Sequence, residues 1–270
     1  MKYKVVVSDL DGTLLNSKHE ISDYTKETIK EIIEKKGIKF IIATGRHFID
    51  ASCFMKQLGS ESYLISSNGT NAHNEKGEIL IEHLMDEKII KELLNLKIEE
   101  DISVNIYTND GWYVEKYLPE FEEYHKESGF APNVVDFKTF DKKDVLKFCF
   151  ISDNVKKIEK LERKIRENPI LKEEVTITAS LDICLEIMRK NVSKGKTLKE
   201  ILDKGGFKLS ETIAFGDGLN DEEMLSVVGK GLIMGNGSEK LKKALPNNEI
   251  ILTTDEDGEA KYLRKIFLEE

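Results

Sequence analysis

The sequence lacks several features that would place it in a particular class of protein. No apolar run approaches the roughly 20 residues that a membrane-spanning helix needs. The net charge is −9 at pH 7, and this shortage of positive charge argues against nucleic acid or a membrane surface as the main partner. The N-terminus lacks the apolar stretch of a signal peptide, because Ser8 and Asp9 interrupt it. We therefore expect a cytoplasmic protein with no nucleic-acid or membrane partner.

Cysteine is scarce as well. The chain has three cysteines, Cys53, Cys149 and Cys184, which are far apart in the sequence and set among apolar residues. This pattern argues against a disulfide framework or a metal site and predicts buried free thiols in a reducing compartment. Hydrophobic residues make up 40% of the 270 residues and charged residues 34%, which is typical of a folded protein with one large domain or two modest ones.

What is present begins with the stretch 5–14, in which three valines precede two aspartates and a glycine. The valines predict a buried strand. Side chains two apart on a strand point to the same face, so Asp9 and Asp11 face one spot, where like charges repel unless a cation or a proton lies between them. Gly12 then permits a sharp turn. The alternative is a plain turn at a strand end. A calcium loop is excluded because Leu14 stands where it requires glycine.

The segments on either side of the inserted stretch described below alternate between strand and helix patterns. Further strands are expected at 38–43, 63–66, 212–215, 231–234 and 250–252, and helices at 22–37, 48–58, 194–203, 221–228 and from 258 onward. Such alternation predicts an α/β fold in which a doubly wound, Rossmann-like parallel sheet carries the helices.

The rhythm changes between residues 82 and 188. Two helical patterns and five strand-like runs appear there, with a hairpin signal at 109–111, and three of the four prolines of the chain fall in this stretch. We interpret this stretch as an inserted α+β unit. The predicted domains are 1–82 with 188–270 for the core, and 83–187 for the insertion.

Polar residues follow four of the core strands. They are Asp9 with Asp11, Thr44 with Gly45, Asn68, and Asp217 with Asn220 and Asp221. In a parallel sheet these strand ends lie along one edge, where ligands bind. An oxygen-only ligand set with few protein groups suits magnesium. The alternative for 216–221 is a glycine-rich turn in which Asp221 caps a helix.

Three further residues are candidates for binding phosphate. Thr44 ends a strand just before a predicted helix, so its hydroxyl and the next backbone N–H groups are placed to hold an anion. Arg46 is either a fork for phosphate or substrate, or a surface charge. Lys194 opens a helix, where it is either a phosphoryl contact or a solvated lysine. A P-loop is excluded because Lys190 stands where its first glycine is required, and a dinucleotide fingerprint fails at Asp221.

Taken in order, these motifs resemble the haloacid dehalogenase-like phosphohydrolase superfamily. Residues 9–15 look like its first motif, Thr44 like the second, Lys194 like the third, and Asp217 with Asn220 and Asp221 like the fourth. The strings 43–46, 67–69, 193–195 and 233–236 further resemble the Cof-type branch, which carries an α/β cap of the C2 type between the second and third motifs. The resemblance covers nearly the whole chain, with specific motifs in the core and only topological similarity in the insertion.

The resemblance implies a magnesium-dependent phosphatase that forms an aspartyl-phosphate. It makes Asp9 the nucleophile and Asp11 the general acid and base, with Thr44 and Lys194 as catalytic contacts to the phosphoryl group. Substrate-binding residues are then Thr44, Gly45, Arg46, Asn68, Lys194 and Asn220, and the metal site consists of Asp9, Asp11, Asp217 and Asp221.

The substrate implied is a small phosphorylated metabolite, such as a sugar phosphate or a phosphorylated cofactor. Two alternatives stay open, a phosphomutase or phosphotransferase on the same core, and a binding homologue without catalysis.

Overall fold

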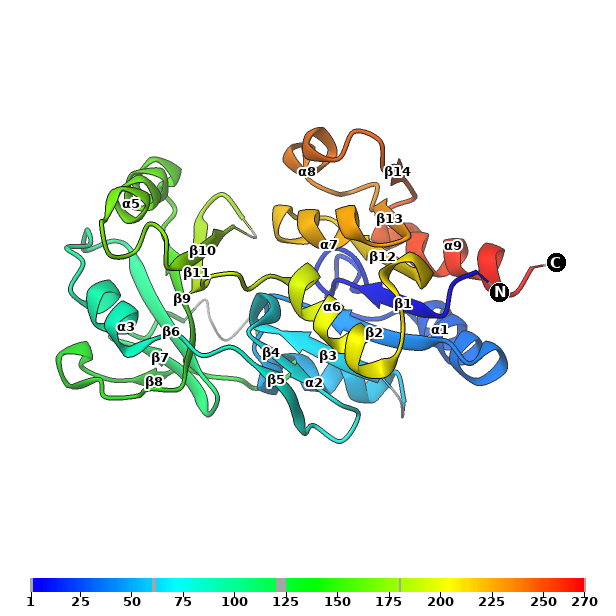
Figure 1. The fold of residues 1–270 in the computed structure, drawn as a ribbon, viewed down its shortest axis with the longest axis horizontal. Coiled ribbons are helices and arrows are strands. Elements are labelled where there is room, and N and C mark those ends of the chain that lie inside the picture. The colour runs from blue at the N-terminus through cyan, green and yellow to red at the C-terminus, as the bar shows by residue number, and fades with distance from the viewer. Residues whose placement is uncertain (1, 60–61, 120–124, 180, 270) are drawn as a thin grey trace. The chain divides into compact units, whose positions relative to one another are not determined.

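The computed structural model describes residues 2–59, 62–119, 125–179 and 181–269 (Figure 1). The chain divides into two compact units. The core unit comprises Met1–Ile81 and Ser193–Glu270, and the inserted unit comprises Glu82–Val192. Among the helices of the described residues, none has the length and apolar character needed to cross a membrane.

The core unit is built on an eight-stranded sheet with the strand order β14-β13-β12-β1-β2-β3-β4-β5. The sheet is parallel from β14 to β3, and β4 pairs antiparallel with β3. Its strands are β1 (Val5–Ser8), β2 (Lys39–Ala43), β3 (Ser62–Ser66), β4 (Asn71–His73), β5 (Ile79–Glu82), β12 (Thr212–Gly216), β13 (Lys230–Ile233) and β14 (Glu249–Ile250). The central strand β1 is therefore flanked by β2 and β12, which are far apart in the sequence.

Helices cover both faces of this sheet (Figure 1). One face packs against α1 (Asp23–Lys36), α2 (Phe48–Gln57) and α9 (Gly258–Phe267). The other packs against α6 (Lys194–Gly205), α7 (Glu222–Val227) and α8 (Glu239–Ala244). Alternate residues of β1 serve the two faces, Val6 on the first and both Val5 and Val7 on the second. The predicted α/β fold with a doubly wound parallel sheet is confirmed.

Local sequence signals explain where the helices begin and end. Ser22 caps α1 by accepting a hydrogen bond from Thr25 N, and Gly37 ends the helix in the left-handed conformation at φ 66°. Ser193 and Gly206 do the same for α6, with Gly206 at φ 72°. The first residue of α6 is consequently Lys194, whose position matters for the site described below.

The inserted unit contains a six-stranded sheet in the order β10-β11-β9-β6-β7-β8. Its strands are β6 (Ser103–Thr108), β7 (Gly111–Val114), β8 (Asn133–Val134), β9 (Val145–Ile151), β10 (Val175–Thr178) and β11 (Cys184–Arg189). The helices α3 (Glu87–Leu94) and α5 (Val155–Glu167) pack on one face. The unit continues past the expected boundary at 187, because β11 runs to Arg189, which pairs with Val175 of β10.

The opposite face of this sheet carries a packed mixture of polar and aromatic side chains. Trp112 is 1% exposed, and its Nε1 donates a 3.0 Å hydrogen bond to Asn105 Oδ1. Lys147 and Glu186 form a buried ion pair. The expectation of three buried thiols needs correction: Cys53 and Cys184 are only half-buried, and the sulfurs of Cys149 and Cys184 lie 3.0 Å apart. Sequence distance hid this contact, which arises because β9 and β11 are paired neighbours.

Candidate active site

The candidate site lies at the carboxyl ends of the parallel core strands. Asp9 directly follows β1, Thr44 follows β2, and Asp217 follows β12. The short 3-10 turn Ser67–Gly69 follows β3. The register brings these ends level, since Ser8 of β1 pairs with both Ile42 of β2 and Phe215 of β12. Segments from both halves of the core unit therefore meet at one sheet edge, as the strand-end motifs suggested.

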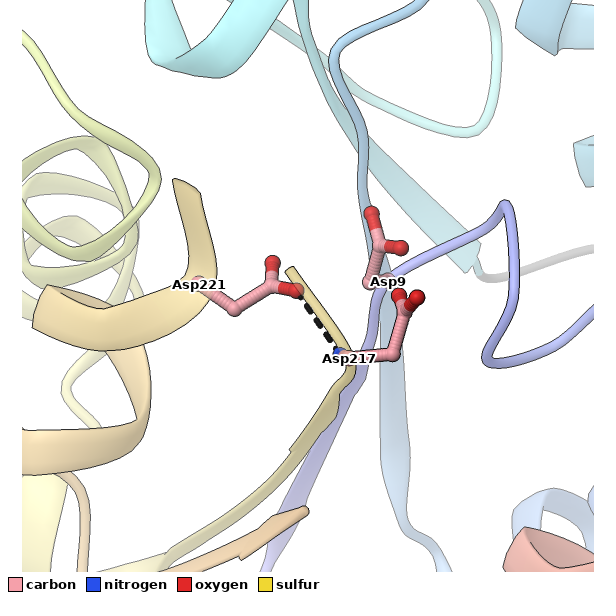
Figure 2. A group of neighbouring side chains, drawn as sticks. All are labelled: Asp9, Asp217 and Asp221. Carbon is pink, nitrogen blue, oxygen red and sulfur yellow. Dashed lines mark hydrogen bonds between the residues drawn. The ribbon is translucent and has the colours of Figure 1, made fainter. Parts of the chain in front are cut away.

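Three carboxylates meet at the centre of this edge (Figure 2). Oxygens of Asp9, Asp217 and Asp221 all lie within 4.8 Å of one another. Figure 2 shows the side chains of Asp9 and Asp217 next to each other at adjacent strand ends, while that of Asp221 points toward the backbone of Asp217. Burial and the charges of Asp221 and Asp217 raise the pKa of Asp9 well above its usual value, against the opposing effect of Lys194.

The same crowding acts on Asp217. Burial and the charge of Asp221 raise the pKa of Asp217 to about 7, with Lys194 acting in the opposite direction. Its Oδ1 accepts a 3.2 Å hydrogen bond from Thr13 Oγ1. Gly12 lies against the same carboxylate: at φ +76°, a Cβ there would stand 2.5 Å from Asp217 Oδ2. The chain thus requires glycine at this turn both for its backbone conformation and for the space that Asp217 occupies.

Lys194 neutralises part of this negative charge. Its Nζ donates hydrogen bonds of 2.6 Å to Asp9 Oδ1 and 2.7 Å to Asp221 Oδ1, and the residue is 0% exposed. Burial alone would lower the pKa of this ammonium group, but the carboxylates of Asp221 and Asp9 outweigh burial and raise the pKa above its usual value. The buried lysine is therefore charged and held at the nucleophile candidate.

Asp221 organises the turn that carries Asp217. Its Oδ2 accepts 3.0 Å hydrogen bonds from the backbone N–H groups of Asp217 and Gly218. Gly216 makes room for it, since a Cβ there would lie 2.6 Å from the Cβ of Asp221. The predicted glycine-rich turn is present, but the alternative that Asp221 caps the next helix is wrong. Its side chain makes no cap hydrogen bond to α7 (Glu222–Val227), because Oδ2 bonds to the turn and Oδ1 to Lys194.

Thr44, Asn68 and Asn220 form a connected polar layer beside the cluster. Thr44 Oγ1 accepts a 3.0 Å hydrogen bond from Arg46 N, and its carbonyl accepts one of 2.9 Å from Asn68 N. Asn220 Nδ2 donates a 3.0 Å hydrogen bond to Asn68 Oδ1. Asn68 holds a left-handed backbone at φ 57°, a conformation that costs energy and that concentrates at functional sites. Gly45 packs against it, where a Cβ would stand 3.2 Å from Asn68 Oδ1.

The side chains of Asp11 and Arg46 bind each other, and Asp11 is not part of the cluster formed by the three carboxylates. Arg46 Nε donates a 2.8 Å hydrogen bond to Asp11 Oδ2, and its NH2 group donates one of 2.6 Å to Asp11 Oδ1. Arg46 Nη1 lies 3.4 Å from Asp50 Oδ2. Sequence reasoning missed Asp50, because Arg46 lies before the predicted helix 48–58 and the helical spacing rule does not link the two residues.

Two more residues behind the nucleophile candidate were missed. Ser8 Oγ lies 2.6 Å from Glu259 Oε2 and 2.7 Å from the carbonyl oxygen of Asp9. Glu259 is buried at the start of α9, and burial raises its pKa to about 8. One hydroxyl proton cannot serve two acceptors, so a protonated Glu259 completes the pair of hydrogen bonds. No sequence signal links position 259 to position 8.

Comparison with known proteins assigns the chain to a family. A family model of haloacid dehalogenase-like hydrolases matches residues 6–263, nearly the whole chain. The chain belongs to this family. A Haemophilus influenzae protein named "Putative phosphatase" is 38% identical over 269 residues, covering 99% of this chain and 98% of that protein.

Two more relatives agree with the family assignment. An HMP-PP phosphatase of Serratia proteamaculans is 32% identical over 263 residues, covering 97% of this chain and 94% of that protein. The crystal structure of a haloacid dehalogenase-like hydrolase from Bacteroides thetaiotaomicron is similar to this chain, with a TM-score of 0.84 and 30% identity. The match covers 98% of this chain and 100% of the other. The predicted superfamily resemblance and the predicted enzyme class, a phosphoric monoester hydrolase, are confirmed.

Proposed function

We propose that this family member is a magnesium-dependent phosphatase that works through an aspartyl-phosphate on Asp9. The observation that carries the proposal is the buried contact between Asp9 and Lys194 at the end of the central strand, beside Asp217. A carboxylate at a strand end can act as a nucleophile toward phosphorus, and a fixed ammonium beside it can stabilise the transferred charge.

The proposed chemistry has two steps. In the first, an Asp9 oxygen forms a bond to phosphorus while the bond to the leaving oxygen breaks, and Asp11 gives that oxygen a proton. In the second, Asp11 takes a proton from water, the water oxygen bonds to phosphorus, and the bond to Asp9 breaks to release phosphate. Asp11 lies two residues after Asp9, a spacing that allows one group to serve both steps.

The phosphoryl oxygens are proposed to lie between Lys194 and the polar layer. Thr44, Gly45, Lys194, Asn68 and Asn220 are the candidates to hold phosphate and substrate. The hydrogen bonds among Thr44, Asn68 and Asn220 support this assignment, because they fix donors at the sheet edge before substrate arrives. Most of the rate enhancement then comes from positioning and charge stabilisation.

The residues present fit a magnesium ion. Three carboxylates lie within 4.8 Å of one another, and Lys194 pairs with two of them, Asp9 and Asp221. Oxygen donors are the ligands that magnesium prefers. Asp9, the backbone carbonyl of Asp11, and Asp217 are the proposed direct ligands, with Asp221 acting through water. When bound, the ion supplies charge neutralisation for the phosphoryl group and for the carboxylates.

We further propose that the inserted unit selects the substrate, as a cap. Every proposed catalytic residue lies in the core unit, while the inserted unit is far longer than an ordinary connection of about 4–6 residues. The inserted unit can bind parts of the substrate that are remote from phosphorus, and that binding energy can help to lower the barrier to phosphoryl transfer. Small phosphorylated metabolites are the proposed substrates, and HMP-PP, named for relatives at 31–32% identity, is one candidate to assay.

Trapping the phosphoenzyme tests the proposal. With labelled phosphate ester and magnesium, acid quenching should capture one labelled phosphoryl group per chain in the native protein and none in Asp9→Asn, which should lose essentially all turnover. The matched control is Asp203→Asn, which should behave like the native protein. Asp203 is an exposed residue of α6 that pairs with Lys199. Near-normal turnover by a folded Asp9→Asn variant would refute the nucleophile assignment.

A further inference from the structure

Arg46 grips Asp11 by both carboxylate oxygens, and this contact suggests a different function from the substrate fork that the sequence suggested. We propose that Arg46 is a positioning residue that acts through Asp11, and that the neighbouring Asp50 holds Arg46 in place. The inference rests on the proposed function, because it takes Asp11 as the acid and base of the reaction.

The geometry of the contact is that of a two-pronged ion pair. The Nε and NH2 groups of Arg46 reach different oxygens of Asp11 at 2.8 and 2.6 Å. Such paired hydrogen bonds fix the plane of the carboxylate as well as its position. The Asp11 side chain is 31% exposed whereas that of Arg46 is 3% exposed, so the buried arginine sets the orientation of the more accessible aspartate.

Arg46 is itself held from several sides. Asp50 lies on the first turn of α2, and its side chain is 0% exposed. Asp50 Oδ2 lies 3.4 Å from Arg46 Nη1. The guanidinium stands 5.4 Å from the centre of the Phe54 ring. Its backbone N–H is bonded to Thr44 and its carbonyl oxygen to Ser67 N. A side chain so fully engaged has little freedom to turn toward a substrate.

The consequence for the reaction concerns Asp11. Each Asp11 oxygen accepts one hydrogen bond from Arg46 and keeps a second lone pair that can take part in proton transfer. Arg46 thereby limits Asp11 to a small set of orientations near the reacting centre. Losing that limit should slow turnover roughly 100-fold, the loss that a misplacement of about 1 Å can cause. Binding of the substrate should change little.

A double-mutant cycle separates this function from a substrate contact. Arg46→Gln, Asp11→Asn and the double variant are compared with the native protein on p-nitrophenyl phosphate with magnesium. We expect Arg46→Gln to lower kcat about 100-fold with KM changed less than about threefold, and to have less than about a twofold effect in the Asp11→Asn background. Asp50→Asn should also lower kcat, by a smaller factor than Arg46→Gln.

Controls keep the outcomes distinct. Arg264→Gln removes an arginine of α9 that pairs with Glu31 of α1 and contacts none of the proposed catalytic residues among those that the structure describes, so it should leave kcat unchanged. If Arg46→Gln does not fold, the cycle is run with Arg46→Lys, which keeps the charge but not the fork. Multiplicative effects of the two substitutions, or a rise in KM alone, would overturn the proposal. Full activity of Asp11→Asn would instead overturn the assignment of Asp11, and the inference with it.

Discussion

Lys194 Nζ lies 2.6 Å from Asp9 Oδ1, and the two residues are 185 positions apart in the chain. The contact forms because β1 and the first turn of α6 converge on the same sheet edge. It places a buried cation at the atom proposed to attack phosphorus, so it links the packing of the core unit directly to its chemistry.

Lys194, and not Lys196, is expected to contact the phosphoryl group. On a helix, residues two apart point about 200° from each other, and it is Lys194 that lies against Asp9 and Asp221. Lys194→Ala should lower kcat on the order of 10²- to 10³-fold, and Lys196→Ala less than about threefold. Steady-state kinetics of both variants, with circular dichroism to confirm folding, measure the difference. The opposite ranking would reassign the lysine.

Magnesium is expected to be required, with Asp217 among its ligands. A chelator should abolish phosphate release and added magnesium should restore it, while calcium should support little activity because its longer bonds misplace the phosphoryl group. Asp217→Asn should raise the magnesium concentration needed for half-maximal activity at least about tenfold. Magnesium titrations of phosphate release for the native and variant proteins measure the shift. Activity that persists unchanged in chelator would contradict the metal requirement.

Glu259 should make stability fall as pH rises. Its pKa in the folded protein is raised from 4.5 to about 8, so the folded state holds the proton more tightly than the unfolded state. The stabilisation is complete below pH 4.5 and is lost as pH rises toward 8, by about 1.4 kcal/mol per pH unit. Glu259→Gln removes this dependence, so the variant should gain stability relative to the native protein between pH 5 and pH 8.5.

Urea denaturation of both proteins at pH 5, 7 and 8.5 measures that gain, because contributions from other titrating groups cancel in the difference. Glu34→Gln, at an exposed position of α1 beside Lys30, serves as the control. A difference between Glu259→Gln and native protein that stays constant across this pH range would show that Glu259 is ionised throughout.

Substitutions on the inserted unit should alter substrate choice more than chemistry. Tyr117, Val134 and Leu181 are large apolar residues exposed there, with Leu181 at 63%. Alanine at each should change the ranking of activities on a panel of phosphorylated metabolites by several-fold, yet change p-nitrophenyl phosphate hydrolysis less than about twofold. Parallel assays on both substrate types decide. Equal losses on both, with the fold intact, would mean that the inserted unit takes part in phosphoryl transfer.

The sequence predicted those parts of the molecule that depend on local pattern. Three valines before Asp9 were enough to predict β1, and strand periodicity predicted the parallel sheet that brings Asp9 and Asp217 together. The sequence did not predict the side-chain contacts that depend on how helices and strands pack together. The ion pair between Arg46 and Asp11 requires the loop between β2 and α2 to lie beside the loop after β1. Glu259 contacts Ser8 only because α9 packs against the sheet. The contact of Cys149 with Cys184 likewise required the strand order of the inserted unit.

The central position of β1 also governs the order in which the molecule can be made. Its neighbour β2 leaves the ribosome soon after it, but β12 follows only after the whole inserted unit has been synthesised. During that interval the inserted unit, a continuous segment with its own hydrophobic core, is complete and can fold, whereas the core sheet still lacks the strand on one side of β1. Asp9 therefore remains without Lys194, Asp217 and Asp221 until most of the chain has been translated.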